Sequence, residues 1–475
     1  MTAMDTVSNA VHYVFLAAAA CFVLGLHLMN HPRTARRGNA LSAGAMAIAI
    51  GATVLLVVHQ DRISGTGWLV LISGGALGAA LGLWAAREVQ MTAMPQLVSL
   101  FNAVGGGAAA LIALNDMLQA EDPAALSARV SLPGALSIVI GAVTFSGSLI
   151  AAGKLQGVVS GAPVVFLGAR LLNVLLPASF VVGTVRLVLA PDSLAALYGL
   201  VAVALLFGVT MVLPIGGADM PVVVALLNAF TGSAVAMAGF VLDETALIIA
   251  GMLVSASGGI LTKLMADAMN RSIANIVVGG FGTGDSAVAA VGGDGAPAQV
   301  RSLSVDDVAV QLAYAGKVVF VPGYGLAAAR AQHELGDLAK LLTDHGVEVS
   351  YAIHPVAGRM PGHMNVLLAE AEVPYTQLKE MDEVNPEFPQ ADVALVIGAN
   401  DVTNPIARRP GNAISGMPIL DVDRAKSVVV IKRSMGHGYA GVDNELYTNP
   451  KTGMFFTDAK KGLAELKAAV GEFVG

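Results

Sequence analysis

The hydrophobic pattern of the chain changes near residue 300. Long apolar runs precede that point, and short apolar segments alternate with polar ones after it. A helix that crosses the hydrocarbon core of a bilayer needs about 20 apolar residues. The first part therefore predicts a polytopic all-α membrane domain of about nine transmembrane helices, near residues 8–29, 39–58, 67–86, 95–115, 134–153, 168–189, 194–213, 220–241 and 245–265. The sixth is interrupted most by polar residues, because Arg170 and Asn173 fall near its start.

The second part predicts strands that alternate with helices. Almost entirely apolar strands are expected at 316–323, 347–355, 391–400, 417–422 and 426–434, and amphipathic or short helices at 326–346, 364–373 and 457–473. Strands without a polar face are typical of a parallel sheet that is covered on both sides. We therefore expect a Rossmann-like α/β domain in the C-terminal part.

Composition supports a division into a membrane part and a soluble part. Of the 475 residues, 55% are hydrophobic and only 13% are charged, and most charges follow residue 290. We expect a membrane domain at 1–272, a Gly- and Ala-rich flexible linker at 273–300 and a soluble domain at 301–475. The net charge of −7 gives no reason to expect a nucleic-acid partner. The single cysteine, Cys21, excludes an internal disulfide and a cysteine metal cluster.

Charges in the short loops predict the orientation of the membrane domain. Basic residues accumulate on the cytoplasmic side of membrane proteins. Alternate loops carry Arg33, Arg36, Arg37, Arg87, Lys154, Lys263 and Arg271, whereas the opposite loops carry Asp116, Glu121, Asp122, Asp243 and Glu244. With nine helices, this pattern places the N-terminus outside and the C-terminal domain in the cytoplasm.

Few polar residues interrupt the apolar spans, and four of them are candidates for function. Asn102, Ser148 and Asn228 lie within predicted helices, and Asp219 lies near the cytoplasmic start of one. Polar groups inside a membrane often line a hydrated path for ions or protons. The alternative for the first three is hydrogen bonding between helices, and the alternative for Asp219 is a helix cap.

A glycine turn follows the first predicted strand of the soluble domain. Gly323, Gly325 and Ala328 fit the pattern G-x-G-x-x-A between a strand and a helix. Glycines in this position permit a tight turn and the close approach of a dinucleotide pyrophosphate. An ordinary turn between a strand and a helix is the alternative.

The choice of dinucleotide depends on charges elsewhere in this domain. The second strand ends without the carboxylate that usually binds the ribose of NAD, and Arg359 follows it instead. Lys432, Arg433 and Ser434 are adjacent and suit a phosphate dianion. These residues favour NADP(H) over NAD(H), although Lys432 and Arg433 also fit a solvated strand end.

Seven segments in order resemble the beta subunit of proton-translocating NAD(P) transhydrogenase. They are "MPQLVSLFNAVGGG", "GKLQG", "GGADMPVVVALLNAF", "VPGYGLAAARAQ", "HPVAGRMPGHMNVLLAEA", "IGANDVTNP" and "KRSMGHGYAGVDN". The resemblance covers essentially the whole chain. It implies hydride transfer between NAD(H) and NADP(H), coupled to proton translocation, without flavin or metal. It also implies that NADP(H) binds from about residue 301 onward and that a separate alpha subunit binds NAD(H). The complex would be a dimer in the bacterial inner (plasma) membrane.

The resemblance also assigns residues to the soluble site. It implies that Asn400 and Asp401 lie near the nicotinamide and that Asp401 senses protonation. It also implies that Gly438, Tyr439, Ala440 and Gly441 form a lid over the cofactor. The nucleotide would be flipped relative to ordinary dinucleotide folds. The implied cofactor-binding residues are Gly323, Tyr324, Gly325, Ala328, Pro355, Val356, Ala357, Gly358, Arg359, Met360, Gly398, Ala399, Asn400, Asp401, Lys432, Arg433, Ser434, Gly438, Tyr439, Ala440 and Gly441.

In the membrane, the resemblance assigns the proton path to Asn102, Ser148, Asp219, Asn228 and Arg271. Some family members carry a histidine where this chain has Asn102. Asparagine does not titrate, so a proton-carrying group must come from elsewhere, and a histidine of the alpha subunit is a candidate. The competing function is a transporter or channel that is regulated by a cytoplasmic nucleotide-sensing domain.

Overall fold

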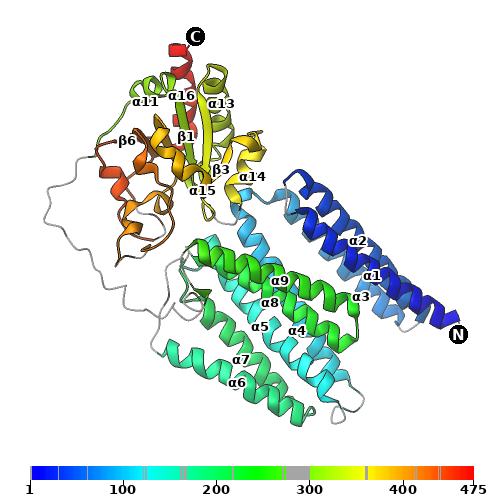
Figure 1. Cartoon of the computed structure of the whole chain (residues 1–475). Helices are drawn as coiled ribbons and strands as arrows, with labels where there is room; N and C mark the ends of the chain where they lie inside the picture. The colour runs from blue at the N-terminus through cyan, green and yellow to red at the C-terminus, as the bar shows by residue number, and fades with distance from the viewer. Residues whose placement is uncertain are drawn as a thin grey trace. The chain divides into compact units, whose positions relative to one another are not determined.

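The computed structural model describes residues 3–29, 32–60, 63–120, 122, 126–160, 164, 168–216, 219–269, 272–273, 276, 300–358, 362–410, 412, 414–436, 438 and 440–474. The chain divides into two compact units (Figure 1). One comprises Met1–Val89, Gln96–Pro214 and Val223–Leu261; the other comprises Gln90–Pro95, Ile215–Val222 and Thr262–Gly475. Most of the predicted linker lies outside the described residues, as do Arg271, Arg359, Met360 and Tyr439.

Long helices make up the part of the chain before residue 270. They are α1 (Ala3–Met29), α2 (Pro32–Gln60), α3 (Gly65–Glu88), α4 (Met94–Gln119), α5 (Ala128–Gln156), α6 (Ala169–Leu189), α7 (Leu194–Val212), α8 (Met220–Leu242) and α9 (Thr245–Ala268). Within the described residues, eight are long and apolar enough to cross a membrane, and α6 contributes a shorter apolar stretch, Val174–Leu189. The predicted class of membrane domain is confirmed, and the sixth helix is the one with the shortest apolar run.

Small residues allow these helices to approach closely. A Cβ atom on Gly106 of α4 would lie 2.8 Å from the Cβ atom of Thr144 on α5. A Cβ atom on Gly105 would lie 2.9 Å from the Thr231 methyl group on α8. Glycine at such positions brings two backbones into van der Waals contact, which is how membrane helices associate. The glycines of α4 therefore set its distance from α5 and α8.

The C-terminal part forms one parallel sheet of six strands in the order β3-β2-β1-β4-β5-β6. The strands are β1 (Lys317–Pro322), β2 (Glu348–Ile353), β3 (Leu378–Glu380), β4 (Val393–Ile397), β5 (Ser427–Lys432) and β6 (Thr452–Phe456). This is the strand order of dinucleotide-binding folds, in which the direction of winding reverses between β1 and β4. The predicted α/β class with a parallel sheet is confirmed.

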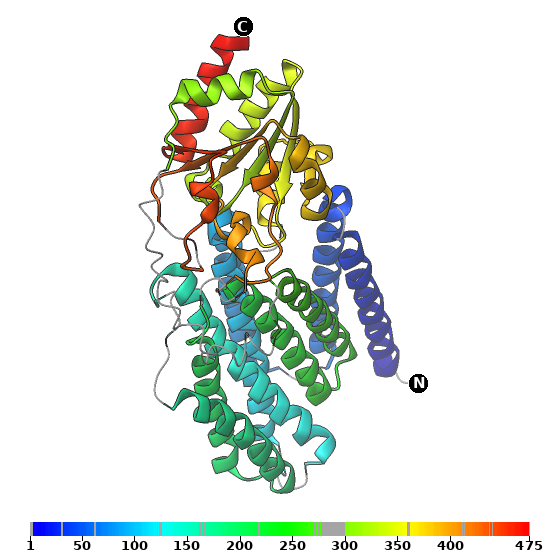
Figure 2. The same ribbon diagram turned by 60° about the vertical axis from the view of Figure 1, so that its left-hand side comes forward.

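Both faces of the sheet are buried. Alternate residues of each strand point to opposite faces, so each strand contributes to two apolar clusters. Val318 and Phe320 of β1 join one apolar cluster with α11 (Val305–Ala313), α13 (Gln332–Asp344) and α16 (Ala459–Val474). Figures 1 and 2 show α13 and α16 side by side on that face. Val319 and Val321 join a second cluster, which short helices and loops cover.

Two sequence predictions in this domain are wrong. The single helix expected at 326–346 is divided into α12 (Tyr324–Ala329) and α13, because Arg330 adopts a left-handed conformation with φ of 51°. The strand expected at 417–422 is an irregular segment followed by a short 3₁₀ helix, Val422–Arg424. Its Leu420 N–H donates to the carbonyl of Val402, so the segment pairs with a loop and not with the sheet.

Two strands, β3 and β6, were not predicted from the sequence. The short edge strand β3 is not fully buried, and β6 contains Gly453, which pairs with Val429 of β5. Neither segment has the long apolar run that identified β1, β2, β4 and β5. Elsewhere in this domain, α14 (His363–Glu370) and α16 form where helices were expected.

Candidate functional site

The carboxyl ends of β1, β4 and β5 bring three predicted segments to one edge of the sheet. Pro322 pairs with Ile397, and Ile397 pairs with Ile431, so these strands end at the same level. The segments that follow are Gly323–Gly325, Gly398–Asp401 and Lys432–Ser434. Ligands of such sheets bind at this edge, where the winding direction reverses.

The glycine turn after β1 is locked against the turn after β4. The N–H groups of Gly323 and Gly325 donate to the carbonyls of Ile397 and Gly398, both at 2.9 Å. A Cβ atom on Gly325 would lie 2.6 Å from the Cα atom of Gly398, which itself has a φ of 66°. The glycines therefore serve the contact between the two turns, and these two N–H groups are used inside the protein. Ala328, also predicted here, is exposed on α12.

Asp401 connects the turn after β4 to the predicted lid. Its Oδ2 accepts a hydrogen bond from the backbone N–H of Ala440 at 3.0 Å. The carboxylate lies so close to Gly438 that a Cβ atom on that glycine would collide with it. Asn400 is held as well, because the Asn444 amide donates to its backbone carbonyl at 3.0 Å and to its Oδ1 at 3.1 Å.

Lys432 lies at the end of β5 and is held by two partners. Its Nζ donates to the carbonyl of Gly436 and to the hydroxyl of Tyr447, the latter at 3.4 Å. Nζ also lies 4.6 Å from the centroid of the Tyr447 ring. Burial lowers the pKa of Lys432, and the negative charge of Asp401 raises it. Arg433 and Ser434 are exposed.

His354 organises the segment that follows β2. Its Nδ1 accepts the N–H of Val356 at 3.2 Å, which leaves Nε2 to donate to the carbonyl of Pro418 at 2.8 Å. The imidazole is 2% exposed, and burial lowers its pKa to about 4. His354 thus fixes the predicted binding segment 355–358 to the loop that contains Pro418. Gly358 of that segment has a φ of 104°, a conformation that favours glycine.

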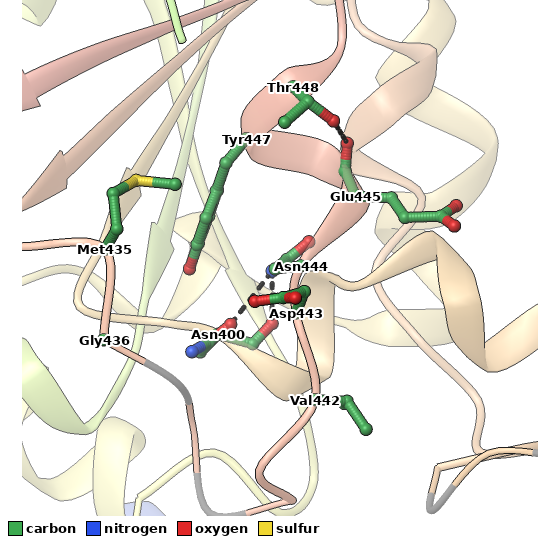
Figure 3. Close-up of a pocket in the computed structure, with 9 residues that line it drawn as sticks. All are labelled: Asn400, Met435, Gly436, Val442, Asp443, Asn444, Glu445, Tyr447 and Thr448. Carbon is green, nitrogen blue, oxygen red and sulfur yellow. Dashed lines mark hydrogen bonds between the residues drawn. The ribbon is translucent and has the colours of Figure 1, made fainter. Parts of the chain in front are cut away.

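A cavity of about 180 Å³ lies beside Asn400. Figure 3 shows its lining residues, which come from the segments after β4 and β5 and from the 3₁₀ helix Glu445–Thr448. The lining residues are Asn400, Met435, Gly436, Val442, Asp443, Asn444, Glu445, Tyr447 and Thr448.

Polar residues where α4, α5 and α8 meet form a second group, which we call the polar seam. It comprises Ser99 and Asn102 on α4, Ser148 on α5 and Thr231 on α8. The Asn102 amide on α4 donates to the Val224 carbonyl on α8 at 3.2 Å, and the Thr231 hydroxyl donates to the Asn102 carbonyl at 3.3 Å. Asn228 lies four residues after Val224 on α8 and therefore on the same side of that helix. The seam thus joins the predicted Asn102 to the side of α8 that carries Asn228.

Ser148 on α5 belongs to the same seam. Its backbone carbonyl accepts the hydroxyl of Ser99 on α4 at 2.8 Å. The Ser148 side chain is fully buried, and its Oγ has no hydrogen-bond partner among the described residues. Asp219 immediately precedes α8, and its N–H donates to the carbonyl of Gly216.

Comparison with known proteins gives the family of this chain. The family model of the NAD(P) transhydrogenase beta subunit matches residues 11–469. The NAD(P) transhydrogenase subunit beta of Rhodospirillum rubrum is 47% identical over 462 residues, which cover 96% of this chain and 98% of the relative. The protein of the same name from Rhodospirillum rubrum strain ATCC 11170 has the same identity to this chain over the same length.

The chain belongs to the NAD(P) transhydrogenase beta subunit family. The predicted family, the enzyme class and the function of a transhydrogenase beta subunit are thereby confirmed. This beta subunit is a multi-pass membrane protein.

Sequence reasoning missed several residues of both parts of the transhydrogenase subunit. Tyr447 and Asn444 contact predicted site residues but lie outside the glycine turn and outside Lys432–Ser434, which we call the KRS motif. His354 was detectable, since it directly follows the buried strand β2 and precedes Pro355. Ser99 was detectable as well, because it lies three residues before Asn102 and therefore on the same side of α4.

Proposed function

We propose that the C-terminal domain, residues 301–475, binds NADP(H) at the carboxyl edge of its sheet, and that an alpha subunit binds NAD(H). Hydride transfer between the two nucleotides would be coupled to proton translocation through the membrane domain. The observation that carries this proposal is that Asp401, bonded to the lid residue Ala440, and Lys432 follow or end neighbouring strands at the carboxyl edge of the sheet.

Selectivity for NADP(H) rests on the end of β5. Lys432, Arg433 and Ser434 follow one another there and offer two cations and a hydroxyl to the 2′-phosphate. No carboxylate follows β2 up to Gly358, where a ribose 2′-hydroxyl would otherwise be bound. The remaining predicted cofactor-binding residues, including Arg359, Met360 and Tyr439, complete the proposed site.

The nicotinamide supplies the hydride chemistry, and no flavin is needed when two nicotinamides are held in contact. The bond between Ala440 N–H and the Asp401 carboxylate would hold the lid over the bound nucleotide. A charged acceptor makes a hydrogen bond about twice as strong as a neutral one. Protonation of Asp401 would weaken this bond and release the lid, so the proton gradient would act on the affinity for NADP(H).

The polar seam is the proposed proton path. Asn102, Ser148 and Asn228 would hydrogen-bond water along it, and Asp219 and Arg271 would lie at its cytoplasmic mouth. Because none of the first three residues titrates in the physiological range, the proton-carrying group would come from the alpha subunit. We further propose that the N-terminus is outside, that the C-terminal domain is in the cytoplasm of a bacterium, and that the complex is a dimer.

Calorimetric titration of the full chain in detergent tests the nucleotide site. We expect tight binding of NADP⁺ and much weaker binding of NAD⁺. Equal binding of both nucleotides would contradict the assignment of Lys432 and Arg433, and binding of neither would contradict the site as a whole.

A further inference from the structure

Tyr447 joins the end of β5 to the turn after β4. It lies in the 3₁₀ helix Glu445–Thr448 and is only 3% exposed. Its hydroxyl donates to the backbone carbonyl of Ala399 at 3.3 Å and accepts from Nζ of Lys432 at 3.4 Å. In Figure 3 the ring stands between Met435 and Asn444 and forms one wall of the cavity.

The Tyr447 hydroxyl can only accept a hydrogen bond from Lys432, because its single hydrogen is already donated elsewhere. A tyrosine hydroxyl has one hydrogen, and here the Ala399 carbonyl takes it. Its lone pairs therefore face the Lys432 ammonium, and the face of the ring attracts the same cation. A lysine side chain is flexible, so such contacts restrict where its charge lies.

The ammonium keeps one donor for a ligand. It has three N–H groups, and within the described residues the Gly436 carbonyl and the Tyr447 hydroxyl accept two of them. A dianionic phosphate beside Lys432 would receive the third. Burial of Lys432 lowers its pKa, so contacts that stabilise its charge are needed at this position.

We propose that Tyr447 is a positioning residue that holds the Lys432 ammonium where the 2′-phosphate of NADP(H) is recognised. This inference rests on the proposed function. It adds that selectivity for the phosphorylated nucleotide depends on a buried hydroxyl outside the KRS motif. Because the same hydroxyl is bonded to Ala399, the position of the cation is tied to the turn that carries Asp401.

The test is Tyr447→Phe in the full chain, which removes the hydroxyl and keeps the ring. We expect the Kd for NADP⁺ to rise roughly tenfold, in line with the loss of a hydrogen bond to a charged group. The Kd for NAD⁺, which lacks the 2′-phosphate, should change less than twofold. A merely structural role would weaken both nucleotides together and lower the unfolding midpoint.

Tyr351→Phe is the matched control. Tyr351 is also fully buried in this domain, but its hydroxyl has no hydrogen-bond partner among the described residues. Its replacement should leave both Kd values unchanged. A second comparison uses Lys432→Gln: if Tyr447 acts through Lys432, adding Tyr447→Phe to that variant should have no further effect on NADP⁺ binding.

The outcomes separate this inference from the proposed function. A wild-type chain without preference for NADP⁺ overturns the proposed function and the inference with it. A wild-type chain that prefers NADP⁺, together with a Tyr447→Phe variant of the same preference, overturns the inference alone. An equal further loss in the Lys432→Gln background would also overturn it.

Discussion

At the scale of residues, single polar groups connect segments that lie far apart in the chain. Asp401 receives the N–H of Ala440, 39 residues later, and His354 reaches Pro418, 64 residues later. Such buried groups are costly unless their partners are in place. Changes at these two residues should therefore disturb both of the segments that each residue connects.

Replacing Asp401 with asparagine should uncouple the lid from protonation. The amide keeps the size of the side chain, but it cannot carry the negative charge that strengthens the bond from Ala440. We expect proton-coupled hydride transfer to fall at least roughly tenfold when the variant is assayed with an alpha subunit in sealed vesicles. Asp337→Asn, which removes an exposed carboxylate paired with Lys467, is the control. Normal coupled turnover of Asp401→Asn would contradict the proposed sensor.

The buried His354 should make the folded C-terminal domain less stable in acid. Its pKa is about 4 in the folded domain, below the ordinary 6.5, because burial disfavours the imidazolium. The unfolded chain therefore binds a proton more readily, and the stability present above pH 6.5 falls as the pH decreases towards 4. The largest contribution is about 3 kcal/mol.

The measurement is the thermal unfolding midpoint of the full chain between pH 7 and pH 4. His354→Gln should show a smaller decrease over this range than the wild type. His345, an exposed imidazole at the end of α13, provides the control, and His345→Gln should keep the wild-type dependence. Identical pH profiles for wild type and His354→Gln would refute this explanation.

At the scale of elements, glycines decide how closely turns and helices approach. The turn after β1 and the turn after β4 touch through Gly325 and Gly398, and α4 touches α5 and α8 through Gly106 and Gly105. A side chain at any of these contacts would separate two elements and displace the polar residues that they carry. Hydrogen bonds then set the orientation of those polar residues, as at Asn102 and Ser99.

Gly325→Ala should disturb the proposed nucleotide site by separating the turn after β1 from the turn after β4. The new methyl group would lie 2.6 Å from Cα of Gly398 and would push Asn400 and Asp401 away. We expect a loss of about 1–3 kcal/mol of stability, together with weaker NADP⁺ binding. Gly471→Ala, in α16 with no atom within 4 Å of the added carbon, should be neutral or slightly stabilising. Unchanged NADP⁺ binding by Gly325→Ala would argue against the link between the two turns.

Ser148→Ala tests the seam between α4, α5 and α8. Because its Oγ has no partner among the described residues, a purely structural serine could be replaced at no cost in stability. If the hydroxyl supports a water path, coupled proton uptake into vesicles should fall severalfold while the chain remains folded. Ser146→Ala on the same helix is the matched control, because that hydroxyl donates to the Leu205 carbonyl on α7. Equal activity of Ser148→Ala and wild type would remove Ser148 from the path.

At the scale of the whole molecule, the chain combines membrane helices with a dinucleotide fold, and within the described residues only one sheet of this fold is present. A hydride transfer between two nucleotides needs two sites. The subunit alone should therefore bind NADP⁺ without transferring hydride, and addition of the alpha subunit should restore transfer. The measurement is the reduction of an NAD⁺ analogue by NADPH, with and without the alpha subunit. Full activity of the isolated chain would contradict the division of the two nucleotides between subunits.

The hydrophobic pattern of the chain was sufficient to predict the membrane helices and the strands β1, β2, β4 and β5. These features depend on local runs of apolar residues, which the solvent or the bilayer selects directly. The glycine turn and Lys432–Ser434 come directly after two of these strands, so the sequence also implied that they share one edge of the sheet. The family resemblance added Asp401 and the lid.

The remaining features depend on contacts that form only in the folded chain. The left-handed break at Arg330, the strands β3 and β6, and the irregular path of 417–422 follow from packing partners that local patterns do not contain. Tyr447 lies 48 residues after Ala399, and Ser148 lies 49 residues after Ser99. Hydrogen bonds across such separations form only when the whole domain is assembled, so no local pattern could have identified them.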